Sequence, residues 1–316
     1  DILMSVRAPV GEISRTFFDV CLGRGMCAIR YPNDFLYHAL VAKESAWVKF
    51  SKGSTFDSVN SEDVEAFCIE LPSDEKEQVA IAEVLSDVDA LLEALDRLIA
   101  KKRAIKQGAM QALLTGRMRL PGFSDRWNRT PLGDIAQITM GQSPDSRNYN
   151  VEGRGIPLVQ GNADIKSRRS IRRVWTTQIT KTCDSGDLLL TVRAPVGVVG
   201  QASEYSCLGR GVCSLKPNGV NGDFLYHALI FAESQWDIVE QGSTFTSANS
   251  SQISAFTVGV PTSLPEQRAI AEVLSDIDAE IDALEKRRAK LRDIKQGMMQ
   301  ELLTGRVRLV GPNAEQ

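Results

Sequence analysis

The chain has 316 residues, of which 43% are hydrophobic and 24% charged, a composition typical of folded soluble proteins and unlike that of disordered or collagen-like chains. Its length exceeds a comfortable single core, so we expect two domains or two copies of one unit. No apolar run approaches the roughly 18 residues that span a bilayer, and no secretory signal is evident at the start. Six cysteines are too few for a disulfide framework in a chain this long, which favours reduced thiols and a cytoplasmic location.

The sequence contains an internal repeat, with the same series of motifs present in two copies. The hexapeptide Val6–Gly11 recurs at Val192–Gly197, and the pentapeptide Cys21–Gly25 recurs at Cys207–Gly211. The motifs DFLYHAL, GSTF, AIAEVLSD and LLTGR also occur in both copies, in the same order. The repeat is far longer than the 20 to 50 residues of solenoid repeats, so each copy is a domain-sized unit and a pseudo-twofold arrangement is expected.

In chain order, the predicted elements divide the chain into five segments. We expect residues 1–72 to be the C-terminal part of a first β-rich domain, 73–120 a central long helix, 121–262 a second β-rich domain, 263–309 a distal long helix and 310–316 a tail. Short β-type runs bounded by turn formers characterise the domains. A capping box opens each helix, and the glycine of LLTGR ends it. The predicted fold class is α+β.

Both long helices carry apolar heptads. The first has Ile81, Val88 and Leu95 in one row, Val84, Leu91, Leu98 and Ile105 in a second, and Leu85, Leu92 and Ile99 beside them. The second has Ile270, Ile277, Leu284, Leu291 and Met298, with Val273, Leu274, Ile281 and Ile294. Each helix of ~40 residues is ~60 Å long at 1.5 Å per residue, more than one globular domain needs. We therefore predict that the two helices pair as an antiparallel coiled coil, with Leu95 and Leu284 in the seam.

The sequence shows no catalytic pattern. It has no Rossmann glycine motif, Walker loop, zinc-protease motif or Asn/Asp-Pro-Pro-aromatic run of amino-methyltransferases. Both histidines, His38 and His227, lie in FLYHAL segments that are expected to be helical, and a structural role is favoured. The repeated C-x5-C pairs lack zinc spacing and are interpreted as small buried residues, with the intervening Gly-Arg-Gly as a tight turn. We expect no catalysis, no cofactor and no metal.

One segment is basic although the whole chain has a net charge of -3. Between residues 147 and 193, nine basic residues stand against four acids, and arginine dominates the centre of this segment. Arginine can grip phosphates and read guanine with two hydrogen bonds, whereas the plain alternative is a solvated turn. Two domains on a rigid spacer suit a split DNA site, which favours DNA contact. The predicted DNA-binding residues are Gln142, Ser143, Arg147, Asn148, Tyr149, Gln160, Asn162, Lys166, Arg168, Arg169, Arg172, Arg173, Arg193, Ser243 and Thr244.

The ordered motifs carry a resemblance to a known family. T/S-V-R-A-P-V-G, C-L-G-R-G, F-L-Y-x-x-L, Q/K-G-S-T-F, P-E-Q-x-x-I-A-E-V-L-S-x-x-D and a long helix ending in L-L-T-G-R-x-R-L follow one another along the chain. In this order they resemble the specificity (S) subunit of Type I restriction-modification enzymes. Residues 121–138 look like the start of that family's target recognition domain, and the likeness covers nearly the whole chain.

The resemblance implies a division of labour. Two target recognition domains would each read half of a bipartite DNA site, and the antiparallel helices would set the unread gap between the halves. The chain itself would catalyse nothing. Two modification (M) subunits would methylate adenine N6 with S-adenosylmethionine, and restriction (R) subunits would add ATP-driven translocation and cleavage. The implied partners are double-stranded DNA and these subunits, without a membrane.

Two other functional classes remain as alternatives. A non-catalytic coiled-coil scaffold without sequence-specific DNA binding would not need the basic segment. A stand-alone nuclease or metalloenzyme would need more clustering of acids or histidines.

The two copies are unequal in this sequence. Asp1 aligns with Asp187, so the first copy has no counterpart of residues 121–186. We therefore expect a chain truncated at its start, with a partly uncovered first core. Residues 1–72 should be proteolysed well before 122–262, and this chain alone should specify one half-site.

Overall fold

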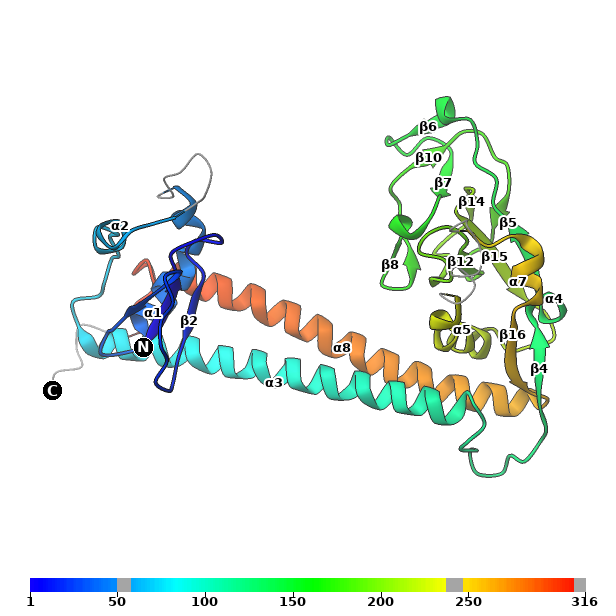
Figure 1. Ribbon diagram of the computed structural model, residues 1–316, viewed down its shortest axis with the longest axis horizontal. Helices are drawn as coiled ribbons and strands as arrows, with labels where there is room; N and C mark the ends of the chain where they lie inside the picture. Colours follow the sequence, from blue (N-terminus) through cyan, green and yellow to red (C-terminus); the bar gives the residue numbers. More distant parts are fainter. Residues whose placement is uncertain (50–57, 237–246, 310–316) are drawn as a thin grey trace. The chain divides into compact units, whose positions relative to one another are not determined.

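The structure is a computed structural model that describes residues 1–49, 58–236 and 247–309 (Figure 1). Its internal contacts define two units: unit 1 comprises residues 1–101 and 282–316, and unit 2 comprises residues 102–281. This division cuts across both long helices, α3 (Glu75–Leu113) and α8 (Leu264–Leu302), so each helix contributes to both units. The five-segment division expected from the sequence stays a prediction.

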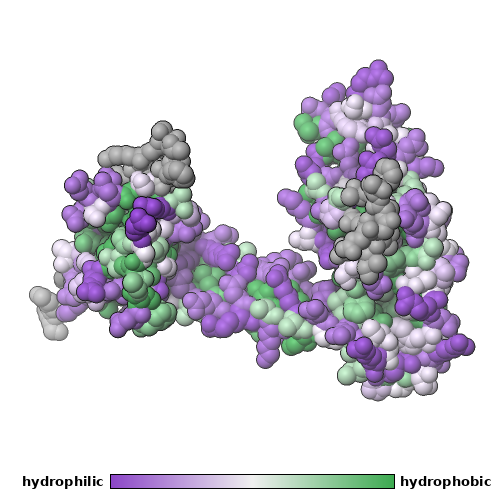
Figure 2. Space-filling model, in the orientation of Figure 1, coloured by the Kyte–Doolittle hydropathy of each residue, from purple (hydrophilic) through white to green (hydrophobic). Residues whose placement is uncertain are grey.

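Unit 1 contains a small antiparallel sheet in the order β2-β1-β3. Its elements besides the long helices are β1 (Ile2–Ser5), β2 (Ile13–Arg15), β3 (Met26–Ile29), α1 (Phe35–Ala42), the 3-10 helix η1 (Glu44–Lys49) and α2 (Ser61–Glu65). Apolar residues gather on the face of unit 1 that Figure 2 shows, and Phe17 is 86% and Leu22 40% exposed. The expectation of a partly uncovered first core stays a prediction, because neither of these two residues belongs to the buried clusters of unit 1.

Unit 2 contains a six-stranded sheet in the order β5-β15-β12-β13-β9-β8, a five-stranded sheet in the order β11-β14-β7-β10-β6 and a two-stranded sheet of β16 and β4. The strands are β4 (Trp127–Pro131), β5 (Ala136–Met140), β6 (Tyr149–Asn150), β7 (Ile156–Val159), β8 (Ile165–Lys166), β9 (Arg169–Ser170), β10 (Trp175–Thr176), β11 (Thr182–Cys183), β12 (Leu188–Thr191), β13 (Val199–Gln201), β14 (Ser206–Leu208), β15 (Val212–Pro217) and β16 (Thr257–Pro261). The helices are α4 (Leu132–Ile135), η2 (Ser146–Asn148), η3 (Asn162–Asp164), α5 (Gly222–Phe231), η4 (Glu233–Gln235) and α7 (Ser250–Ala255).

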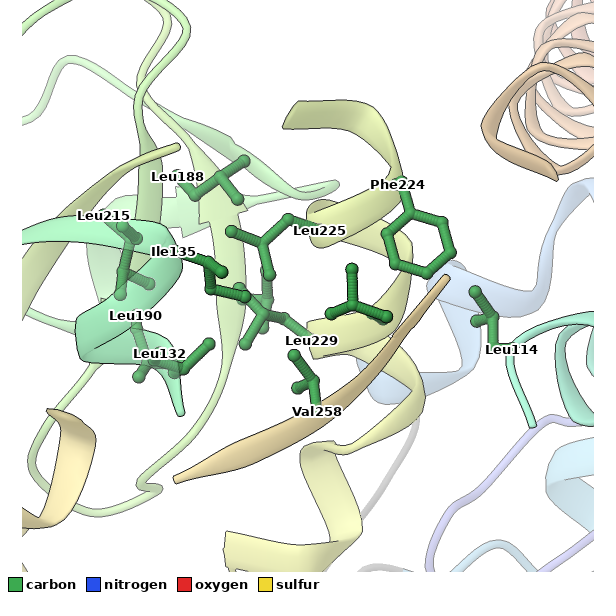
Figure 3. Packing of buried hydrophobic residues seen from close by; sticks show 14 of the residues in the cluster. Leu114, Leu132, Ile135, Leu188, Leu190, Leu215, Phe224, Leu225, Leu229 and Val258 are labelled. Carbon is green, nitrogen blue, oxygen red and sulfur yellow. The ribbon is translucent and has the colours of Figure 1, made fainter. Parts of the chain in front are cut away.

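The core of unit 2 explains the continuous apolar run of β12. Successive side chains of a strand point to opposite faces, and both faces of β12 are covered. Leu188 and Leu190 join the main cluster, whereas Leu189 joins a second, smaller one. Figure 3 shows Leu225 and Leu229 of α5 within the main cluster, which also includes residues of α4 and β16.

The repeated motif VRAPVG forms the same local packing in each copy. Gly11 and Gly197 both adopt φ near +88°, and a Cβ on either would lie 2.5 Å or less from an atom of Trp47 or Trp236. Each tryptophan stacks on a phenylalanine, with ring centroids 3.9 Å apart in unit 1 and 4.0 Å apart in unit 2. The final glycine of the motif is therefore required by backbone conformation and by packing.

Ion pairs show that the long helices run antiparallel within each unit. In unit 1, Asp89 pairs with Lys295 at 2.6 Å, and Asp96 pairs with Arg288. In unit 2, Lys102 pairs with Glu280 at 2.7 Å and Lys106 with Asp278 at 2.6 Å. Within each unit, the residue number of the partner on α8 decreases as the residue number on α3 increases. The predicted α+β fold with antiparallel long helices is confirmed.

The position of the seam differs from the heptad prediction on both long helices, and on α8 Val273 is 36% and Ile294 46% exposed. On α3, Ile81, Leu85, Leu95 and Ile99 are buried, as two of the predicted rows require. The other row, Val84, Leu91, Leu98 and Ile105, is instead 37 to 45% exposed. Its predicted burial between the two helices is therefore wrong. A helix buries about one face against a single partner, and here the two other rows fill that face.

Candidate nucleic-acid interface

The turn between β14 and β15 gathers several polar and basic side chains on unit 2. Backbone hydrogen bonds tie this turn to the ends of β5, β7 and β12. The residues brought together are Gln142, Ser143, Gln160, Arg193 and Arg210, which we name the turn cluster. Arg210 also donates its backbone N–H to Ser143 Oγ at 3.0 Å. Four of the five were predicted from the sequence as DNA-binding residues.

The glycines of the repeated CLGRG motif make this turn possible. A Cβ on Gly211 would lie 2.2 Å from the carbonyl oxygen of Gln160, which no side chain tolerates. The segment that follows β7 can therefore pass directly against the turn. The interpretation of Gly-Arg-Gly as a tight turn agrees with the geometry, but sequence reasoning passed over Arg210 itself. Its position between two glycines that pack closely was the available signal.

The turn cluster is positively charged. Arg193 and Arg210 are both exposed, and within the described residues neither side chain makes an ion pair. Gln142 is exposed, while Ser143 and Gln160 are half-buried. Exposed guanidinium groups beside amide and hydroxyl groups can bind phosphate and base edges.

The hairpin β8–β9 carries the centre of the basic segment. Lys166 and Arg169 are exposed and have no ion pair among the residues described. Arg168 instead bends inward with φ +63°, donates to Val199 O at 3.1 Å and forms a two-point ion pair with Glu233. Burial alone would lower the pKa of the Arg168 guanidinium, but the pair with Glu233 outweighs it and raises the pKa. Arg168 therefore anchors the hairpin.

The hairpin lies at the other end of the sheet from the turn cluster. Arg169 lies opposite Gln201 in the pairing of β9 with β13, and Gln201 lies opposite Leu188 at the start of β12. Arg193 follows the far end of β12, up to ~17 Å further along an extended chain. The predicted DNA-binding residues thus form more than one group on unit 2.

The other predicted residues have partners within the chain or lie elsewhere. Arg147 pairs with Asp145 at 2.8 Å, Asn148 donates to Gln178 at 3.1 Å, Tyr149 donates to Pro144 O at 3.1 Å, Arg172 pairs with Glu204 at 2.8 Å and Arg173 with Asp164 at 3.1 Å. Asn162 is exposed in η3. Ser243 and Thr244 lie outside the described residues. A surface ion pair is worth little, so these arginines can still exchange a carboxylate for a phosphate.

The two histidines lie in the interior, as expected. His38 is 0% and His227 1% exposed, and each Nε2 lies 3.0 Å from a serine Oγ of a long helix, Ser86 or Ser275. Burial lowers the pKa of each imidazole to about 4. Both are neutral at pH 7 and join a short helix to a long one.

The cysteines follow the prediction in unit 2 but not throughout unit 1. Burial raises the pKa of Cys183 and Cys213 to about 12, and Cys207 is also buried. Cys21 is exposed, so its predicted burial is wrong, and Cys27 is only half-buried. The counterpart of Cys21, Cys207, lies in β14 between β11 and β7, whereas no described strand of unit 1 includes Cys21. Across the described part of the chain, no group of three or more His, Cys, Asp or Glu could hold a metal ion, and no helix is long and apolar enough to cross a membrane.

Comparison with known proteins places the chain in a family. The family model described as "Type I restriction modification DNA specificity domain" matches residues 1–102 and 124–293. The chain belongs to this family, as its motifs indicated. It is similar to the protein of Methanocaldococcus jannaschii named as the putative type I restriction enzyme MjaX specificity subunit, with 31% identity over 265 residues. That match covers 80% of this chain and 62% of the relative, so the chain spans less than two thirds of that relative's length.

Solved structures agree with the fold. The type I restriction-modification S subunit from M. genitalium gives a TM-score of 0.72 at 19% identity, covering 95% of this chain and 82% of that one, which shows the shared fold. The chain is also similar to a chain in a solved structure of a type I restriction-modification system, which concerns complex assembly and conformational transition. This match has a TM-score of 0.59 at 26% identity. That match covers 97% of this chain and 82% of that chain.

Proposed function

We propose that the chain is the DNA-recognising subunit of a type I restriction-modification system. Its recognition domains each read part of a bipartite duplex site, and it positions methyltransferase and restriction subunits on that DNA. Family membership supports this function. The turn cluster is the observation that carries it, because exposed, unpaired guanidinium groups lie beside amide side chains on one turn in the described part of unit 2. A coiled-coil scaffold alone would have no use for such a surface.

The chemistry then belongs to the partners. Methyl transfer from S-adenosylmethionine to adenine N6 is assigned to M subunits, and ATP-driven translocation and cleavage to R subunits. We assign positioning to this chain, and its two histidines are buried and neutral, which suits a structural role. We include double-stranded DNA and two M subunits among its direct partners.

The exposed heptad row of α3 is the proposed contact for an M subunit. Within unit 1, Val84, Leu91 and Leu98 present apolar side chains at intervals of one heptad. In the second copy of the repeat, Leu91 and Leu98 correspond to Glu280 and Arg287 of α8, so the matching row of α8 is not continuously apolar. The M content of the purified complex should fall in Leu91→Arg, because the M subunit that contacts this row is lost, and should be unchanged in Arg287→Ala. An unchanged M content in Leu91→Arg would remove this contact from the proposal.

Salt-dependent binding of duplex DNA tests the proposed function. The chain with its M subunits should bind a cognate duplex at least ~10³-fold more tightly than an unrelated duplex, and log Kd should rise linearly with log salt. A coiled-coil scaffold would show neither property. Equal affinity for all duplexes would contradict sequence-specific recognition.

A further inference from the structure

Two arginines occur at equivalent positions of both copies of the repeat. Arg193 belongs to VRAPVG and Arg210 to CLGRG in unit 2, and Arg7 and Arg24 are their counterparts in unit 1. Sequence reasoning assigned DNA contact to Arg193 alone. All four equivalent positions therefore carry arginine.

The backbone holds each pair in the same way. In unit 2, Val192 N donates to Gly211 O at 2.9 Å, and Ala248 N donates to Val192 O at 2.9 Å. In unit 1, the matching bonds run from Val6 N to Gly25 O at 2.8 Å and from Val59 N to Val6 O at 3.0 Å. These bonds place the arginine that follows each valine next to the Gly-Arg-Gly turn.

A second set of contacts repeats as well. Arg193 forms an isolated antiparallel bridge with Ser247, and Arg7 forms one with Ser58. These bridges use the backbone of each arginine and leave the guanidinium group uncommitted. The two units therefore present the same pair of side chains from the same local framework, each within its own unit.

The fold does not explain these side chains. Gly11 and Gly197 are identical because a tryptophan packs against each of them, but the four arginines are all exposed. Within the described residues none of the four side chains forms an ion pair, whereas Arg168, Arg172 and Arg173 all have carboxylate partners. Their shared identity calls for a ligand that is the same for both units.

The phosphodiester backbone is the part of duplex DNA that is the same at every site. Residues that read bases must differ between two domains that read different half-sites, while residues that bind phosphates need not. We propose that Arg193 with Arg210, and Arg7 with Arg24, are phosphate-binding pairs that hold DNA without regard to its sequence. This inference rests on the proposed function and assigns base reading to residues outside the repeated motifs.

Substitutions in the full chain, assayed with its M subunits, test the assignment. The double variant Arg193→Gln/Arg210→Gln should bind its cognate duplex and an unrelated duplex more weakly by the same factor. Because each phosphate contact adds ~0.9 to the slope of log Kd against log salt, the slope should fall by ~2. Arg193→Lys/Arg210→Lys keeps the charges and should retain most of the slope. The pair Arg7 and Arg24 should behave in the same way.

Lys216→Gln is the matched control. Lys216 lies near the other end of β15 from Arg210, is exposed and pairs with Asp184 at 2.8 Å, so its loss should leave the slope unchanged. Circular dichroism should show that all variants are folded, since the altered arginine side chains are exposed and form no ion pair within the described residues. An unchanged slope in the double glutamine variant, or weakening of the cognate duplex alone, would overturn the assignment. Specific, salt-dependent binding of the cognate duplex by the wild type would still support the proposed function. Wild-type protein that binds no DNA would refute both.

Discussion

Protonation of the buried histidines should weaken each unit as the pH falls. His227 of α5 has its Nε2 3.0 Å from Ser275 Oγ of α8, and its Nδ1 is buried without a hydrogen-bond partner in the described chain. Burial is the main cause of its lowered pKa, and Lys106 lowers it further, while Asp278 and Asp223 act in the opposite direction. His38 is placed in the same way in unit 1.

The sign and size of the effect follow from the lowered pKa. The folded imidazole has a pKa of about 4, against 6.5 for a histidine in the unfolded chain, so the unfolded chain binds the proton more readily between these values. The stabilising contribution is complete above about pH 6.5 and is lost as the pH falls toward 4. At pH 5 each histidine should have cost about 2 kcal/mol of its unit's free energy of unfolding.

The assay is urea unfolding at pH 7.5 and pH 5.0, for the wild type and for His227→Gln and His38→Gln. Carboxylates also titrate in this range, but they contribute equally to the wild type and the variants. Each substitution should therefore reduce the loss of unfolding free energy between the two pH values by about 2 kcal/mol. Equal losses in the wild type and both variants would refute the conclusion that these imidazoles are buried and neutral.

Three further predictions concern packing, the hairpin and the thiols. Leu274 is 0% exposed, so Leu274→Ala should lower the free energy of unfolding by ~2 to 5 kcal/mol. Leu91 is 41% exposed, so Leu91→Ala should lower it by less than ~1 kcal/mol. Similar losses in the two variants would place the seam elsewhere. Arg168→Ala should loosen the β8–β9 hairpin, seen as faster hydrogen exchange, whereas Arg169→Ala should leave exchange unchanged and weaken DNA binding; the reverse pattern would contradict their assigned roles. Iodoacetamide at pH 8 should alkylate the exposed thiols of unit 1 and spare the buried thiols of β11 and β15 until the protein is unfolded, and rapid modification of the latter would show that they are accessible.

Local and repeated patterns were predictable from the sequence. The long helices follow from their heptads and caps, and the antiparallel pairing follows from having two of them separated by a β-rich domain. The choice between apolar rows did not follow, because Leu85 and Leu91 look alike in sequence and only the partner helix buries one of them.

The candidate site was predictable only in part. The composition of the basic segment singled out its arginines as candidates. It cannot show that Arg168 forms an ion pair with Glu233, 65 residues further along the chain. Nor can it show that the turn cluster lies at the far end of β12 from the hairpin. The backbone bonds of the CLGRG turn create that cluster and bring Arg210 into it, which is a tertiary property.

Selection of duplex DNA from a randomised library is the most direct test of the central claim. The full chain with its M subunits should enrich duplexes that share fixed base positions, and the Arg210→Gln variant should lower the yield without changing those positions. Enrichment of no common sequence by the wild-type complex, under salt conditions where it binds DNA, would contradict the account that this chain recognises a specific site.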